Sequence, residues 1–198
     1  CLIGNNHHQV PFAVKIFRFL NGICPERIMP IVRTGHQPFA VRDLRDDEWH
    51  VGYKIVDQNY KSVKTLIHYL VKAAGRNANL LMNIGPQPNG ELPAAALERL
   101  KAIGEWTKQY GETIYGTRGG DISPRDWGVT TRKGDKLYVH ILNLPDKGLF
   151  LPLTTGKVKS AVDLKTETGE VLQDKNGVVL ELAEVPAELD YVIELTIK

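Results

Sequence analysis

The stretch Asn79-Leu80-Leu81-Met82-Asn83-Ile84 decides the fold class. It is a short, continuous apolar run, which is typical of a parallel strand that is buried on both faces. Gly85-Pro86 ends the run, and Pro88-Asn89-Gly90 predicts a turn directly after it. We therefore expect a buried strand over residues 79–84.

Helical patterns flank this strand on both sides. Residues 63–74 repeat apolar side chains at helical spacing, with Asn59 as the N-cap candidate and Gly75 at the end. Pro93 suits the first turn of a second helix, which we expect to end before Gly111. The apolar face of this second helix is predicted to consist of Ala96, Leu97, Leu100, Ile103 and Gly104. The order helix, buried strand, helix indicates an α/β unit.

Beyond residue 118 the pattern changes to short strands. Apolar and polar residues alternate over 137–141 and again over 193–197, and Asn176-Gly177 is a hairpin signal. Several short strands at a spacing of about 8–12 residues predict a small antiparallel β-sandwich. We expect two domains, an α/β domain over residues 1–118 and a β-domain over residues 119–198.

Composition excludes several classes of protein. The chain has 198 residues, of which 42% are hydrophobic and 24% charged, and this is an ordinary globular composition. A net charge of +2 gives no reason to expect a nucleic-acid partner. No apolar run reaches the roughly 18 residues of a membrane helix, so we predict no membrane span. Cys1 and Cys24 form no C-x-x-C pair and no zinc spacing. Because the chain opens inside an apolar run, we expect it to be part of a longer protein.

The candidate site residues are few. His7 and His8 follow a predicted strand, but adjacent strand residues point to opposite faces and rarely share one metal ion. If these two histidines have a function, we expect one of them to line a pocket at the end of the strand. The alternative is that they belong to a polar loop without a function. Acidic residues interleaved with Arg42 and Arg45 indicate a solvated loop; they are Asp43, Asp46, Asp47 and Glu48. No phosphate loop, nucleophile elbow or complete acid/base set is present.

Four motifs resemble those of one enzyme family. Residues 79–86 with Asn89-Gly90 resemble the N-L-L-L-N-x-G-P-x-x-D/N-G run of alpha-L-fucosidases, glycoside hydrolase family 29. Residues 100–106 and 110–118 resemble the L-x-x-I/V-G-x-W and G-E-x-I-Y-G-T motifs of that family. Gly52-Tyr53 resembles the end of its W-G-Y motif. The motifs occur in the order and at the spacing of the family.

The resemblance implies the C-terminal part of a (β/α)-barrel, followed by a β-sandwich. It implies hydrolysis of terminal α-L-fucosides with retention, by an Asp nucleophile and a Glu acid/base, without metal or cofactor. The substrate would be a fucosylated oligosaccharide or glycoconjugate, and the parent enzyme would be exported to the periplasm or outside the cell. His7 and His8 are the only substrate-binding residues that it carries over, since the nucleophile belongs to a strand N-terminal to this chain.

Residues 14–51 differ in composition, with five of the ten arginines but one of the fifteen lysines. Residues 14–21 can be encoded by codons that, when translated in a reading frame shifted by one base, give G-E-D-I-Q-I-F-E. This string resembles the acid/base loop of the family. A one-base shift of residues 39–51 reads L-P-F-E-T-C-E-T-M-N-G-M-W and completes W-G-Y. We interpret residues 14–51 as out of frame, which puts Asn21 at the acid/base position.

An amide cannot transfer the proton, so we predict that this chain has no catalytic residue and is inactive. The alternative reading is a non-catalytic carbohydrate-binding or structural β-sandwich module. Exposed aromatic residues on one sheet face would favour that module, and the strands offer mainly Tyr138 and Tyr191.

Overall fold

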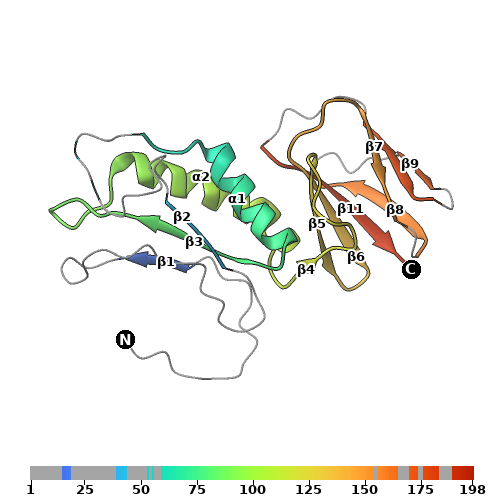
Figure 1. Cartoon of the computed structure of the whole chain (residues 1–198), viewed down its shortest axis with the longest axis horizontal. Coiled ribbons are helices and arrows are strands. Elements are labelled where there is room, and N and C mark those ends of the chain that lie inside the picture. Colours follow the sequence, from blue (N-terminus) through green and yellow to red (C-terminus); the bar gives the residue numbers. More distant parts are fainter. Residues whose placement is uncertain are drawn as a thin grey trace, which may run out of the picture.

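A computed structural model describes residues 15–18, 39–43, 53, 55, 59–153, 156–164, 170–173, 176–182 and 189–198. Helices and a parallel sheet form its first part, and antiparallel strands form its second part (Figure 1). The predicted strand within residues 1–13 lies outside the described residues.

The first part is a parallel sheet with helices on one of its faces. Its elements are β1 (Lys15–Arg18), β2 (Phe39–Asp43), α1 (Val63–Gly75), β3 (Asn79–Ile84), α2 (Ala94–Tyr110) and the short 3-10 helix η1 (Gly111–Thr113). The sheet has the order β1-β3-β2, with β3 paired in parallel to both neighbours. The predicted helix, strand and helix are thus confirmed, and β3 is the centre of the sheet.

The burial of β3 differs from the expectation in one respect. Leu80, Met82 and Ile84 are buried against α1 and α2, whereas the alternating residues Leu81 and Asn83 are only half-buried. The prediction that both faces are buried is therefore wrong within the described residues. The physical reason is that both helices pack on the same face of the strand.

The N-terminus of α1 is capped by Ser62, so the prediction of Asn59 as the cap is wrong. The hydroxyl oxygen of Ser62 accepts a hydrogen bond from the backbone N–H of Thr65 at 3.1 Å. Serine is well suited to this position because its short side chain reaches an amide that the helix leaves free.

The buried face of α2 is also shifted from the predicted one. Ala96 and Ile103 are buried as expected, but Leu97 is 50% exposed and Gly104 lies on the solvent side. The buried stripe continues instead through Trp106 and Tyr110, toward the C-terminal end of the helix. The aromatic side chains of this end fill the space beside α1, and Leu97 is left at the surface.

The second part consists of two antiparallel sheets. Its strands are β4 (Arg118–Gly119), β5 (Gly128–Lys133), β6 (Lys136–Ile141), β7 (Gly148–Leu151), β8 (Val158–Asp163), β9 (Glu170–Gln173), β10 (Val178–Glu181) and β11 (Tyr191–Ile197). One sheet has the order β4-β5-β6-β11-β8 and the other the order β7-β10-β9. Strands β9 and β10 pair antiparallel on either side of Asn176-Gly177, which confirms the hairpin.

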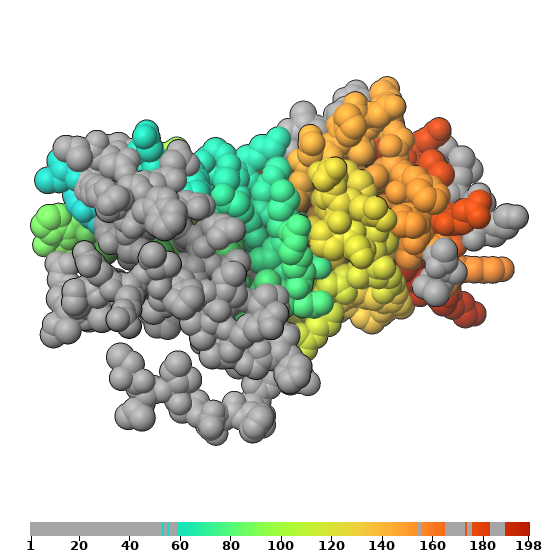
Figure 2. All heavy atoms as spheres, viewed as in Figure 1, coloured from blue at the N-terminus to red at the C-terminus, as the bar shows by residue number. Residues whose placement is uncertain are grey.

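The five-stranded sheet is covered on both faces. Along β6, Leu137, Val139 and Ile141 contribute to a core shared with the three-stranded sheet. Tyr138, between them, belongs to the core that contains α1, β3 and α2. Figure 2 shows α1 lying directly against the first antiparallel strands. The two parts of the chain are therefore joined by a continuous apolar core.

Candidate functional site

The carboxyl ends of the three parallel strands meet at one edge of the sheet. The register pairs Arg18 of β1 with Ile84 of β3, and Asp43 of β2 with Asn83 of β3. Ligands of α/β proteins bind at this edge, because the loops that follow the strands converge there. The loop after β3 (residues 85–92) is therefore the described segment on which we build the site.

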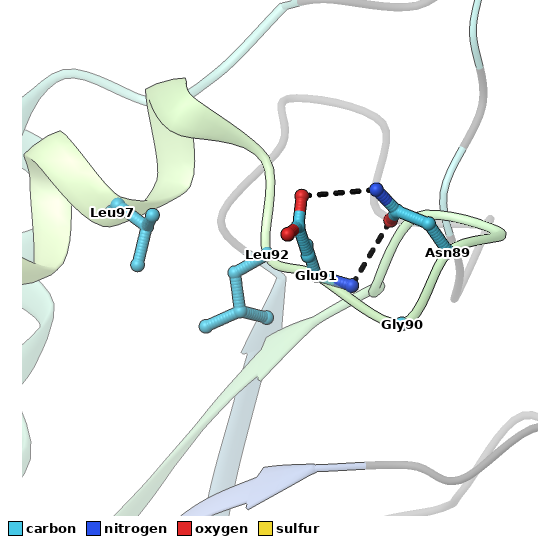
Figure 3. A pocket seen from close by; sticks show the side chains of 5 residues that line it. All are labelled: Asn89, Gly90, Glu91, Leu92 and Leu97. Carbon is cyan, nitrogen blue, oxygen red and sulfur yellow. Dashed lines mark hydrogen bonds between the residues drawn. The ribbon is translucent and has the colours of Figure 1, made fainter.

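Hydrogen bonds within this loop hold it in one conformation. The N–H of Gln87 donates to the carbonyl of Glu91 at 2.8 Å, and the N–H of Gly90 donates to the carbonyl of Gln87 at 2.8 Å. The side chain of Asn89 bonds Glu91 twice: its Oδ1 accepts from the backbone N–H at 3.1 Å, and its Nδ2 donates to Oε2 at 2.9 Å (Figure 3). Gly90 has a φ of 83°, which favours glycine.

An open pocket of about 600 Å³ lies beside this loop. Its described lining consists of Asn89, Gly90, Glu91, Leu92 and Leu97. Figure 3 shows the carboxylate of Glu91 turned toward Asn89, while Leu92 extends from the opposite side of the chain. A retaining glycosidase needs two carboxyl groups about 5–5.5 Å apart. Glu91 is the only carboxylate of this described lining, so these five residues do not form such a pair.

Most of the candidate residues of the sequence fall outside the described residues. These are His7, His8, Asn21, Asp46, Asp47 and Glu48. Asp43 is the last residue of β2. Within the described part of the chain, no group of three or more His, Cys, Asp or Glu residues could hold a metal ion. Among the helices described, none is long and apolar enough to cross a membrane.

The sequence profile of the family described as Alpha-L-fucosidase matches residues 6–112, which is more than half of the chain. The chain belongs to the alpha-L-fucosidase family. Human tissue alpha-L-fucosidase is 31% identical over 192 residues, which cover 87% of this chain and 40% of that protein. An alpha-L-fucosidase of Branchiostoma floridae is 29% identical over 141 residues, which cover 70% of this chain and 31% of that protein.

Solved fucosidase structures have the same fold. Alpha-L-fucosidase isoenzyme 1 from Paenibacillus thiaminolyticus superposes with a TM-score of 0.72 at 31% identity, over 81% of this chain and 39% of that one. A Bacteroides thetaiotaomicron fucosidase of family GH29, trapped as a covalent intermediate with 2-fluoro-fucosyl fluoride, has a TM-score of 0.72 at 26% identity. That match covers 81% of this chain and 38% of the other. This fucosidase-family chain thus spans less than half the length of these relatives.

Two aromatic residues of the fucosidase motifs, Trp106 and Tyr115, and the nearby Trp127 serve packing in this chain. Trp106 is 6% exposed, and its ring centroid lies 5.7 Å from that of Tyr110. Tyr115 packs against the core around α1, and Trp127 packs against the core between the antiparallel sheets. Trp106, Tyr115 and Trp127 thus contribute to the packing of these cores. The side-chain clasp between Asn89 and Glu91 was missed, because the Asn-Gly pair predicts the turn but not the partner of its amide.

Proposed function

We propose that this chain is the C-terminal part of a retaining exo-alpha-L-fucosidase. In this proposal, residues 1–118 supply the last units of a (β/α)-barrel and residues 119–198 form a β-sandwich. The whole enzyme hydrolyses terminal α-L-fucosides of glycans. The observation that carries the proposal is the position of the family motif: residues 79–90 form the central parallel strand and the loop at its carboxyl end, where barrel enzymes place their active sites.

The chemistry requires groups that we assign outside the described residues. A nucleophilic Asp forms the fucosyl-enzyme, and a Glu first protonates the leaving oxygen and then activates water. Our frame hypothesis puts Asn21 at the position of that Glu. General acid/base catalysis contributes about 10²–10⁴-fold, and without the nucleophile no covalent route exists. The chain as it stands is therefore expected to be inactive, with His7 and His8 as its fucose-binding residues.

The alternative, a non-catalytic carbohydrate-binding or structural β-sandwich module, loses much of its support. It relied on Tyr138 and Tyr191 as exposed aromatic residues of a sheet. Tyr138 is only 1% exposed, and the hydroxyl of Tyr191 donates to Asp163 at 2.8 Å in a partly buried position. Neither residue offers the flat exposed ring on which a sugar stacks.

A chromogenic α-L-fucoside tests the proposal. The 198-residue chain is assayed beside a full-length, frame-restored protein whose upstream part comes from resequencing the source DNA through codons 10–55 and beyond. We expect no turnover by the former and turnover with retained configuration by the latter. In the restored protein, changing the Glu at position 21 to Gln should reduce turnover by about 10²–10⁴-fold. A restored protein that folds but shows no turnover would refute the proposed function.

A further inference from the structure

The outer face of the three-stranded sheet carries an exposed apolar pair. Phe150 on β7 is 52% exposed and Val179 on β10 is 36% exposed, and the register places them directly opposite each other. The residues on either side of them along the strands are buried in the core between the two antiparallel sheets; these are Leu149, Leu151, Val178 and Leu180. Because strand residues alternate between faces, Phe150 and Val179 lie on the side that faces away from the other sheet.

The ring of Phe150 lies over the backbone of the neighbouring strand. A Cβ atom at Gly177 would lie 2.8 Å from both Cε2 and Cζ of Phe150, so glycine is needed there to leave room for the ring. The ring is thus supported by β10 and half exposed to solvent. Within the described part of the chain, no other aromatic side chain is exposed. Phe150 therefore offers the exposed ring that Tyr138 and Tyr191 do not.

Beside this pair, the same face has an open place and a carboxylate. Gly148 on β7 and Glu181 on β10 are paired in the register, one step along the face from Phe150 and Val179. Both are exposed, and a Cβ atom at Gly148 would meet nothing within 4 Å. Diagonal neighbours on one face of an antiparallel pair lie about 7–8 Å apart, so the side chain of Glu181 can reach a ligand that rests on Phe150. We call Gly148, Phe150, Val179 and Glu181 the outer-face platform.

The size and chemistry of the platform fit a sugar better than a protein. A phenylalanine side chain buries about 150–250 Å², so the exposed half of Phe150 offers roughly 100 Å². A stable protein interface covers about 800 Å² on each partner, which is far more. One face of a single sugar ring matches the smaller area. The C–H groups of that face are apolar, and the hydroxyl groups at its rim can donate to a carboxylate.

We propose that the outer-face platform binds one neutral sugar ring of a fucosylated glycan, with the C–H face of the sugar stacked on Phe150 and its hydroxyl groups donating to Glu181. This inference rests on the proposed function, which makes glycans the substrates of the whole enzyme. The charge of Glu181 repels anionic sugars, so the platform selects neutral ones. Figure 1 shows β7 and β9 at the end of the molecule opposite to β1 and β3, so the platform lies away from the sheet that the upstream part of the proposed enzyme would complete.

NMR of the full chain, with labelled phenylalanine rings and valine methyl groups, tests the proposal. The neutral probe is 2′-fucosyllactose, and a sialylated trisaccharide is the anionic probe. We expect 2′-fucosyllactose to shift the signals of Phe150 and Val179 in a saturable way and to leave those of Val129, which is 1% exposed, in place. The sialylated probe should bind more weakly, and Glu181→Gln should reduce this difference.

Substitutions at the ring give a second readout. Phe150→Ala should weaken binding about 2- to 12-fold, which is what one aromatic contact contributes, and Phe150→Trp should restore it. Leu189→Ala is the matched control, because Leu189 is 39% exposed but lies outside the three-stranded sheet, and it should leave the affinity unchanged. Equal affinities of the unaltered chain and Phe150→Ala would overturn the proposal. Shifts of the same signals with protein concentration, in the absence of sugar, would overturn it by assigning the platform to a second copy of the chain.

The titration needs no turnover, so it is separate from the test of the proposed function. In the frame-restored protein, Phe150→Ala should leave kcat and KM for a small chromogenic fucoside unchanged. Turnover of that fucoside without any sugar-induced shift at Phe150 would refute the platform and leave the proposed function intact. The same titration on the frame-restored protein decides the question if the shorter chain fails to fold.

Discussion

Replacing Gly75 by alanine should weaken the contact between α1 and β5. A Cβ atom at this position would lie 2.5 Å from Cβ and 2.7 Å from Cγ2 of Val129. Gly75 is absent from the glycines with positive φ, so space rather than backbone freedom explains it. Alanine gains about 1 kcal/mol of helix propensity over glycine, whereas overpacking costs about 1–3 kcal/mol. Because a β-branched side chain on a strand yields little, we expect a net loss of about 1–2 kcal/mol.

Gly104 on α2 provides the control for this substitution. A Cβ atom there meets nothing within 4 Å, so Gly104→Ala should stabilise the chain by up to about 1 kcal/mol. Urea unfolding followed by circular dichroism measures both variants. A double-mutant cycle with Val129→Ala then measures the coupling, because the smaller side chain leaves room for the new methyl group. The steric argument fails if Gly75→Ala stabilises the chain as Gly104→Ala does. It also fails if the changes in unfolding free energy caused by Gly75→Ala and Val129→Ala are additive in the double mutant.

Three further outcomes follow from single contacts. Asn77 has a φ of 54°, and its Oδ1 accepts a hydrogen bond from the N–H of Gly119 at 2.6 Å. Both Asn77→Ala and Asn77→Gly remove this bond, but only alanine is strained at a positive φ, so urea unfolding should show a larger loss of stability for Asn77→Ala. Equal losses of stability would contradict the role of φ. Ser62→Ala should lower the free energy of unfolding by about 1 kcal/mol, and Ser62→Asp by much less, because aspartate can also cap a helix. Thermal unfolding measures both variants, and equal losses of stability would exclude the capping role of Ser62. Burial lowers the pKa of His68, so the unfolded chain binds more protons below about pH 6.5 and stability falls as the pH falls through that range. His68→Gln should remove this part of the pH profile, and an unchanged profile would show that His68 does not cause it.

Local sequence signals were sufficient for most elements of the fold. The apolar run of residues 79–84, the position of Pro93 and the alternation over 193–197 lie within single elements, and each predicted element is present. These signals depend on the residues of one helix or strand. They therefore need no knowledge of what packs against that element.

Apart from the cap of α1, which is Ser62 and not Asn59, the errors concern partners that are distant in sequence. Leu97 fits the apolar stripe of a helix, but its exposure depends on where α1 packs. Phe150 and Val179 carry no motif, so only the pairing of β7 with β10 reveals that they lie side by side. For the site, the sequence predicts only that His7 and His8 line a pocket at the end of a strand, and both lie outside the described residues. His7 and His8 remain predictions.

The two-sided burial of the five-stranded sheet has a consequence for dissecting the chain. Cutting at residue 118 would bare a sheet face that carries Val129, Tyr138 and Val192, all of which are buried in the intact chain. An isolated β-domain would present this surface to water and would be prone to self-association. Heating should melt the helices and this sheet in one cooperative step. The boundary seen in the sequence is a change of architecture, and the unit of stability extends across it.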